Sequence, residues 1–310
     1  MEERINPKQN ITMVVPTIPK DVGKFLANID VYFELLPISS ICVIGNEVLH
    51  FMLPDDNRIL YVKEDSLVDF KKIKDLIIRR SNSDSAGKRA GWYIQQFIKL
   101  GYSKICKDDY YLLWDSDTVP VKRVELFDDA GIPYLDCKTE YHKPYFDTIS
   151  QLFPGYEKQV EGSFIAEHML INKQFMLDMI NSIEQNTSLE GEDYTEKIIN
   201  AINPIELDSS GFSEFETYGT YVCKKYPNNY KIREWKSLRF GGFYFGGAKS
   251  LNDEERKWIA KRYDAISFEK GDYTSFLKVL VPVLKHFCSP KILDYLSIPI
   301  RGFRKMIGKR

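Results

Sequence analysis

The sequence predicts an α/β protein whose central sheet is mostly parallel and is flanked by helices. Short β-rich runs alternate with stretches of helical composition, and the runs cover residues 11–15, 41–44, 59–62 and 110–114. Strands that are separated by helices favour parallel pairing through crossover connections. With 310 residues, of which 44% are hydrophobic, the chain is long enough to bury a substantial core.

The first strand and helix are predicted on either side of a proline-rich turn. Residues 11–15 form an apolar run that ends in Pro16-Thr17-Ile18-Pro19. Asp21 then occupies the position of a helix N-cap before a helix over residues 22–36. Residues 66–100 have helical composition with a break near 81–87, and the buried-strand pattern of 110–114 leads directly into Asp115.

After Asp117 the expected elements are shorter. We expect an aromatic-rich loop over 138–162, a strand over 163–171, a helix over 173–184 and a polar stretch over 186–195. A later helix over 253–263 is opened by Asn252 with Glu255 three residues on, which is the spacing of a capping box.

Charge is distributed unevenly along the chain. Residues 275–310 contain eight Lys or Arg and one acid, a net charge of +7 that leaves −8 for residues 1–274 out of the total of −1. Apolar and basic residues alternate within 276–287 and 298–307, as in amphipathic helices that rest on anionic membranes. A helix that docks on the acidic body of the protein is the alternative. Nucleic-acid binding is not expected, because basic residues are not clustered elsewhere.

Cysteine content and hydropathy favour the reducing cytoplasm. The five cysteines are odd in number and show no zinc-site spacing. The N-terminus lacks the apolar core of a signal peptide, and no stretch approaches the roughly 20 apolar residues of a spanning helix. We therefore expect a cytoplasmic protein that is peripheral on the inner face of the cytoplasmic membrane.

The leading chemical motif is Asp115-Ser116-Asp117, directly after an apolar strand. Two carboxylates at a strand end can hold a hard cation such as Mn²⁺ or Mg²⁺, and that cation can bridge diphosphate oxygens and stabilise a leaving group. A polar turn after a strand is the alternative, since an Asp-x-Asp triplet arises by chance about once in a chain of this length.

Several segments resemble bacterial GT-A glycosyltransferases of capsule and lipopolysaccharide assembly. They are VVPTIPKD (14–21), GWYIQQFIKL (91–100), LLWDSDTVPV (112–121), FIAEHMLI (164–171) and SEFETYGTYV (213–222). The resemblance implies a GT-A fold, a nucleotide-sugar donor, most simply a UDP-sugar, and a saccharide or lipid-linked acceptor. It also implies a transferase domain over 1–250, with a donor half (1–120) and an acceptor half (121–250), followed by a basic helical segment (251–310).

The same resemblance suggests donor-side residues. They are Pro16, Thr17, Lys20, Asp21, Arg89, Gln95, Lys99 and Asp115. A helix-capping turn is the alternative role for Asp21. Gln95 and Lys99 are four residues apart and share a helix face, which could equally be a solvated one.

Glu214 and Glu216 are the candidate catalytic carboxylates, because an inverting transferase needs a base for the acceptor hydroxyl. Two residues apart at a helix start, they would point in different directions. Ser213 and Glu216 also have capping-box spacing, and if Ser213 is the cap, Glu214 becomes the preferred base.

Histidines and aromatic residues supply the remaining candidates. His168 is the best-placed third metal ligand beside Asp115 and Asp117, although a core histidine or an acceptor contact is the commoner role. His142, Tyr145, His168 and Phe243 are candidate acceptor contacts, because aromatic faces suit the CH faces of sugars. Phe243 lies in FGGFYFGG (240–247), for which an aromatic hairpin is the alternative.

Other enzyme classes lack their motifs. The sequence has no P-loop, no dinucleotide-binding GxGxxG, no GxSxG elbow and no HExxH. Two alternatives remain: a nucleotidyltransferase or sugar-phosphate transferase, and a catalytically inactive, membrane-attached scaffold that binds glycans. The second would have no need for both the Asp115/Asp117 and the Glu214/Glu216 pairs.

Overall fold

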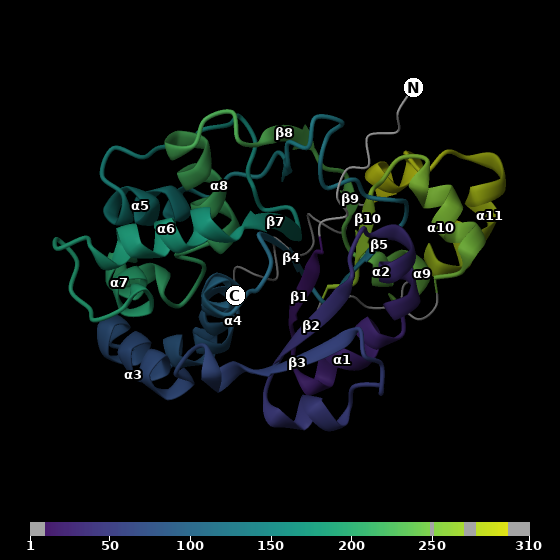
Figure 1. Ribbon diagram of the computed structural model, residues 1–310. Helices are drawn as coiled ribbons and strands as arrows, with labels where there is room; N and C mark the ends of the chain where they lie inside the picture. Colours follow the sequence, from purple (N-terminus) through teal and green to yellow (C-terminus); the bar gives the residue numbers. More distant parts are fainter. Residues whose placement is uncertain (1–9, 249–250, 270–276, 297–310) are drawn as a thin grey trace. The chain divides into compact units, whose positions relative to one another are not determined.

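The computed structural model describes residues 10–248, 251–269 and 277–296 (Figure 1). The chain forms two compact units, each assembled from three separate segments. Unit 1 combines Met1–Gly23, Pro37–Ser116 and Glu125–Trp235, and unit 2 combines Lys24–Leu36, Asp117–Val124 and Lys236–Arg310. These units differ from a division at residue 250, because unit 2 also takes two segments from the N-terminal half.

Unit 1 is built on a five-stranded sheet with the order β3-β2-β1-β4-β7. Its first four strands are parallel and the last is antiparallel: β1 (Thr12–Pro16), β2 (Ser40–Gly45), β3 (Ile59–Lys63), β4 (Tyr110–Trp114) and β7 (His168–Asn172). The predicted α/β class with a parallel-dominated sheet is therefore confirmed. The chain moves outward from β1 to β3 and then returns to place β4 on the other side of β1, which makes the β1/β4 boundary a topological switch point.

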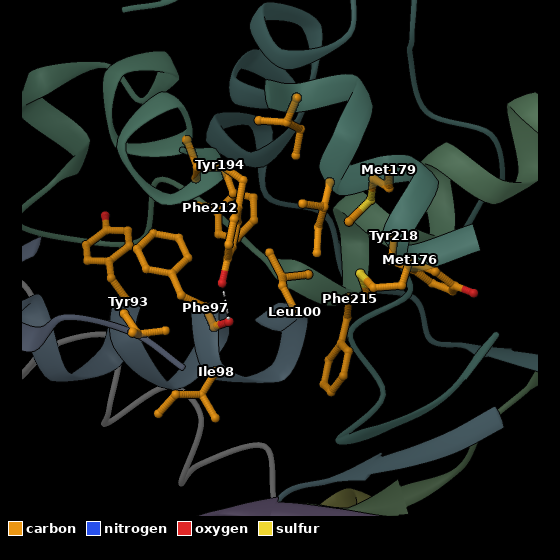
Figure 2. Close-up of a cluster of buried hydrophobic side chains, with 14 of the residues drawn as sticks. Tyr93, Phe97, Ile98, Leu100, Met176, Met179, Tyr194, Phe212, Phe215 and Tyr218 are labelled. Carbon is orange, nitrogen blue, oxygen red and sulfur yellow. Dashed lines mark hydrogen bonds between the residues drawn. The ribbon is translucent and has the colours of Figure 1, made fainter. Parts of the chain in front are cut away.

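Helices cover one face of this sheet. Cys42, Val14, Leu113 and Met169 form a row across four strands, and all belong to the main hydrophobic core. The core also takes residues from α3 (Phe70–Ser81), α4 (Ala90–Gly101), α6 (Lys173–Glu184), α7 (Tyr194–Ala201) and α8 (Glu214–Lys225). Figure 2 shows aromatic side chains of α4, α7 and α8 and the methionines of α6 within this core, with Tyr218 of α8 beside Met176. This packing fixes α4 and α8, which carry most of the candidate site.

Unit 1 also contains a further helix and a separate pair of strands. Helix α5 (Lys143–Leu152) lies within the segment predicted as an aromatic loop, so that prediction was wrong over these residues. A proline at the helix start and an apolar face formed by Ile149 and Leu152 explain why a helix forms there. Strands β6 (Tyr134–Cys137) and β8 (Lys231–Glu234) form a separate parallel pair.

The helix predicted over 22–36 is two helices, α1 (Pro19–Leu26) and α2 (Ile29–Leu35). The amides of Asp21 and Val22 both donate to the carbonyl of Ile18, so the helix begins before Asp21. Asp21 lies in the first turn and is not the N-cap, which corrects the prediction.

Among its described residues, unit 2 contains α2, a three-stranded sheet and further helices. Its sheet has the order β5-β10-β9, formed by β5 (Thr118–Pro120), β9 (Ser237–Leu238) and β10 (Ala265–Ser267). The helices are α9 (Gly241–Phe245), α10 (Asp253–Ala260) and α11 (Leu277–Phe287). Residues 241–245 are thus helical and do not form a hairpin, whereas the capping box of Asn252 and Glu255 is confirmed.

A second hydrophobic core lies in unit 2, formed around Val119, Tyr244, Trp258, Ile259 and Ile266. Helix α11 confirms the predicted C-terminal amphipathic helix over 276–287 from Leu277 onward. The second predicted helix, over 298–307, lies outside the described residues. Within the described part of the chain, no helix combines the length and apolar character needed to cross a bilayer.

Candidate functional site

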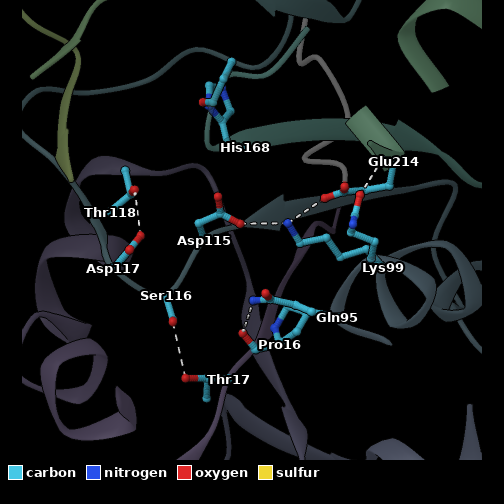
Figure 3. Close-up of polar contacts among 12 residues, drawn as sticks. Pro16, Thr17, Gln95, Lys99, Asp115, Ser116, Asp117, Thr118, His168 and Glu214 are labelled. Carbon is cyan, nitrogen blue, oxygen red and sulfur yellow. Dashed lines mark hydrogen bonds and ion pairs between the residues drawn. The ribbon is translucent and has the colours of Figure 1, made fainter. Parts of the chain in front are cut away.

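The ends of β1 and β4 meet at the switch point of the unit 1 sheet. β1 ends at Pro16, and the next residue, Thr17, donates its amide to the carbonyl of Ile44 at 2.9 Å. Asp115 and Ser116 directly follow β4. The Thr17 hydroxyl donates to the Ser116 hydroxyl at 3.3 Å, so the two strand ends are linked (Figure 3). Ligands of open parallel sheets bind at this kind of position.

Lys99 on α4 joins two carboxylates from distant parts of the chain. Its Nζ lies 2.7 Å from Asp115 Oδ1 and 2.7 Å from Glu214 Oε1, and the three side chains are seen together in Figure 3. It also lies 4.2 Å from the ring centre of Phe215. Burial of the ammonium lowers the pKa of Lys99, but the charges and hydrogen bonds of the two carboxylates outweigh burial and raise the pKa above its ordinary value. Lys99 is therefore a buried cation between two carboxylates.

Gln95 lies one helical turn before Lys99 and reaches the end of the neighbouring strand. Its Nε2 donates to the Pro16 carbonyl at 3.4 Å. The predicted shared face of Gln95 and Lys99 thus faces the sheet edge, Gln95 toward β1 and Lys99 toward β4. α4 contributes one side chain to each strand end of the switch point.

Glu214 is positioned by the start of α8. Ser213 is the N-cap, and its hydroxyl accepts the Glu216 amide at 3.2 Å. The Glu214 amide donates to Gln96 Oε1 at 3.1 Å, which holds the first residue of α8 against α4. The helix start therefore directs the Glu214 carboxylate onto Lys99.

Glu216 points away from Lys99 and Asp115. Its Oε2 accepts from the Ser163 hydroxyl at 2.5 Å and from the Phe164 amide at 3.2 Å, instead of closing the capping box onto Ser213. Its Oε1 is buried and has no hydrogen-bond partner among the described residues. Burial raises the pKa of Glu216, and the two accepted hydrogen bonds offset part of that rise. The expectation that the two glutamates diverge is met, and Glu216 binds the loop before β7.

A loop at 209–210 gathers three further candidates in unit 1. Arg89 donates from Nε to the Ser209 carbonyl at 2.8 Å and from Nη2 to the Ser210 hydroxyl at 3.1 Å. His142 Nε2 lies 2.8 Å from the Ser210 carbonyl oxygen, and the His142 and Tyr145 rings are 4.5 Å apart. Burial, with a smaller contribution from the charge of Glu214, raises the pKa of Tyr145 to about 12. These residues thus gather on the Glu214 side of unit 1.

Trp92 belongs to this group and was missed by the sequence analysis. The Arg89 guanidinium lies 4.5 Å from the centre of the Trp92 ring, a cation–π contact. Arg89 and Trp92 are three residues apart, a spacing that brings side chains together on a helix and that could have indicated the contact.

His168 lies on the other face of the sheet from Asp115. It pairs in register with Trp114, and their rings are 5.0 Å apart. Since successive strand residues point to opposite faces, Asp115 faces α4 while His168 faces away from it. The two His168 nitrogens lie 2.8 Å from the Ala166 carbonyl and 2.9 Å from Asp136 Oδ2. The structure therefore does not bring His168 to Asp115 as a third metal ligand.

Asp136 ties His168 to β8, because Arg233 donates to both Asp136 oxygens at 2.6 and 2.7 Å. This group was not among the candidates predicted from the sequence. Its members are dozens of residues apart, and no local spacing connects them.

The remaining candidates belong to α1 and to unit 2. Lys20 is exposed and Asp21 is half-buried in the first turn of α1. Asp117 is the first residue of its segment in unit 2, where its carbonyl accepts from the Phe268 amide at 2.8 Å. Phe243 lies in α9 and packs against the unit 2 core. Among the described residues, no group of three or more His, Cys, Asp or Glu side chains is arranged to hold a metal ion.

The fold and site define an α/β protein with a polar, carboxylate-bearing edge at the switch point of a parallel sheet. Residues 52–270 match the family of unknown function DUF6492, and the chain belongs to this family. The family description assigns no activity. No curated protein matches the sequence.

Among the solved structures that match this chain are two glycosyltransferases. One is the galactosyltransferase LgtC in complex with donor and acceptor sugar analogs, at 12% identity and a TM-score of 0.42, covering 89% of this chain and 95% of that one. The other is the apo form of the glycosyltransferase GlyE from Streptococcus pneumoniae TIGR4. It has 10% identity and a TM-score of 0.35, and the match covers 93% of this chain and 63% of that chain.

Proposed function

We propose that the protein is a glycosyltransferase that moves a sugar from a nucleotide-sugar donor, most simply a UDP-sugar, to a saccharide or lipid-linked saccharide acceptor in surface polysaccharide synthesis. The observation that supports this most directly is the position of Asp115 at the end of β4, beside Thr17 at the switch point. This is where a parallel sheet binds a phosphorylated ligand, and Asp115 belongs to the motif that resembles the DxD of such enzymes.

The two carboxylates of the motif would suit a magnesium or manganese ion whose remaining ligands come from the substrate and from water. Such ions use one or two carboxylates together with water and substrate phosphates, and do not need a cage of protein ligands. Asp115 keeps 33% of its side chain exposed despite its contact with Lys99, and the motif adds Asp117 as the second carboxylate. A bound ion would supply Lewis-acid stabilisation of the diphosphate leaving group.

The residues around this edge would bind and orient the two substrates. Pro16 and Thr17 would border the donor nucleotide, since Pro16 ends β1 and Thr17 directly follows it. Glu214 is the proposed base for the acceptor hydroxyl, because Glu216 is held by Ser163 and Phe164. The acceptor would lie on the side of unit 1 where His142 and Tyr145 gather.

Donor binding can be tested by thermal unfolding with UDP, GDP and CMP, each with and without Mn²⁺. A ligand that binds only the folded state raises the melting temperature. We expect one nucleotide to do so in a Mn²⁺-dependent manner for the wild type and for the control Asp75→Asn, an exposed carboxylate on α3. Asp115→Asn should lose the shift. An unchanged shift in Asp115→Asn would contradict the metal assignment.

Turnover can be tested by identifying the released product. We expect a nucleoside phosphate to be released from a nucleotide-sugar, whereas pyrophosphate would indicate nucleotidyl transfer. Glu214→Gln should slow transfer by about 10²-fold or more with little change in donor affinity. Wild-type turnover in a folded Glu214→Gln protein would remove Glu214 from the role of base.

A further inference from the structure

Helix α11 has two apolar faces, and only one of them is used by the core of unit 2. Leu277 and Val281 are buried in that core. Val279, Val283 and Phe287 are 78%, 54% and 83% exposed. They follow one another at intervals of four residues, so they form one stripe along the outside of the helix. Packing in the unit 2 core explains the face with Leu277 and Val281, but it does not explain the exposed face with Val279, Val283 and Phe287.

The stripe belongs to a concentration of exposed apolar side chains. Fifteen large hydrophobic residues are exposed in the described part of the chain, and five of these lie between residues 279 and 295. Leu280 extends the stripe sideways, and Tyr295 lies in the segment after the helix. Single exposed apolar residues are ordinary, but a contiguous group marks a surface that meets another apolar phase.

Basic residues accompany this stripe. Lys278, His286 and Lys291 are exposed on or just after α11. Lys285 instead pairs with Glu254 of α10 at 2.6 Å, which fixes the helix to unit 2. In the sequence, residues 297–310 add five Lys or Arg and no acid. An apolar stripe bordered by positive charge is complementary to anionic lipid, whose headgroups attract the charges while the acyl boundary receives the apolar side chains.

We propose that the outer face of α11 inserts Val279, Val283 and Phe287 into the interface of an anionic lipid bilayer, with the helix lying in the membrane plane. The three side chains span about 12 Å along the helix axis at 1.5 Å per residue, so a helix lying flat can place all three at one depth. The proposal goes beyond sugar transfer and does not depend on it.

The test is sedimentation of the full-length protein with vesicles of phosphatidylcholine, with and without phosphatidylglycerol. The variant Val279→Ser/Val283→Ser/Phe287→Ser removes the stripe. The matched control Val48→Ser/Ile205→Ser/Phe51→Ser removes residues of nearly the same kinds that are 52%, 76% and 84% exposed in unit 1. Circular dichroism and the melting temperature establish that each variant is folded.

We expect the wild type and the control variant to bind vesicles that contain phosphatidylglycerol, and the stripe variant to bind them at least about tenfold more weakly. If the triple variant fails to fold, Phe287→Ser alone should weaken binding measurably. Equal binding by wild type and folded stripe variants would overturn the proposal. The proposal would also be overturned if the wild type were a dimer and the stripe variant a monomer with unchanged vesicle binding. The stripe would then be the contact surface for a second copy of the chain.

Discussion

Lys99 is the residue that gives the candidate site its geometry. A buried ammonium between two carboxylates is stable only while both partners are present, since an unpaired charge in the interior is costly. Asp115 and Glu214 are 99 residues apart in the sequence, and each lies 2.7 Å from Lys99. Lys99 thus connects the strand-end carboxylate to the start of α8.

Substitution of Lys99 tests this pairing. Lys99→Met leaves two carboxylates without their shared cation, and we expect the free energy of unfolding to fall by about 3–5 kcal/mol in urea titrations. Lys63→Met is the matched control, because Lys63 also lies between two carboxylates, Glu47 and Asp65, but at the surface. The control should change stability little. Equal decreases in the free energy of unfolding for the two variants would mean that the burial of Lys99 and its two partners adds nothing to stability.

Glu216 makes the stability of the protein depend on pH. Burial raises its pKa above the ordinary value of 4.5, so the folded state binds this proton more tightly than the unfolded state does. Stability from this group is then fully present below pH 4.5 and is lost as the pH rises through the folded pKa.

Glu216→Gln should remove that pH dependence while its amide oxygen still accepts from Ser163 and Phe164. We therefore expect the stability of the wild type, measured relative to the variant by urea unfolding, to decrease as the pH rises from 4.5. Parallel stability curves for the two proteins across this range would show that Glu216 titrates normally.

At the scale of elements, α8 is placed by a glycine at its centre. A Cβ added to Gly219 would lie 2.3 Å from Phe164 Cδ2. The close approach brings α8 against the loop before β7, the same loop that Glu216 binds. The helix that carries Glu214 therefore depends on the absence of a side chain at Gly219.

Gly219→Ala should destabilise the protein by about 1–3 kcal/mol, although alanine is the better helix former, because the added methyl group collides with an aromatic ring in the core. Gly23→Ala in α1 meets no atom within 4 Å and should instead be neutral or stabilise by up to about 1 kcal/mol. Thermal and urea unfolding of the two variants provide the comparison. A stabilised Gly219→Ala protein would contradict the close packing.

Element boundaries were predictable where one signal dominated. The strand at residues 110–114 and the helix at 173–184 were predicted to the residue, since an unbroken apolar run and a regular apolar face define them. α5 was not predicted, because its tyrosine and phenylalanine residues are also typical of an aromatic loop. Its buried face, formed by Ile149 and Leu152, is evident only in the structure. The division of residues 22–36 into two helices likewise depends on contacts beyond local sequence.

At the scale of the whole molecule, two hydrophobic cores belong to two units that are interleaved along the chain. The boundary between the units falls between Ser116 and Asp117 in the sequence, within the DxD motif. Cores built from separate residues can open independently, and such cooperative units are measured by native-state hydrogen exchange.

Ile259→Ala should lower the opening free energy of amides in α10 by about 2–5 kcal/mol, because Ile259 is fully buried in the unit 2 core. Amides of β1 in unit 1 should keep their protection from hydrogen exchange. Ile180→Ala in the unit 1 core is the reciprocal variant, and it should affect β1 and leave α10 unchanged. Equal loss of protection at both places would show one cooperative structure.

Local periodicity and the order of strands and helices were enough to predict the α/β class, the parallel strands and the position of Asp115 at a strand end. The three-dimensional fold, by contrast, was needed to learn which distant side chains meet. It joined Lys99 to Glu214, turned Glu216 toward Ser163 and placed His168 on the other face of the sheet from Asp115. Pairing between distant residues depends on the packing of whole helices against the sheet, which no local spacing in the chain encodes.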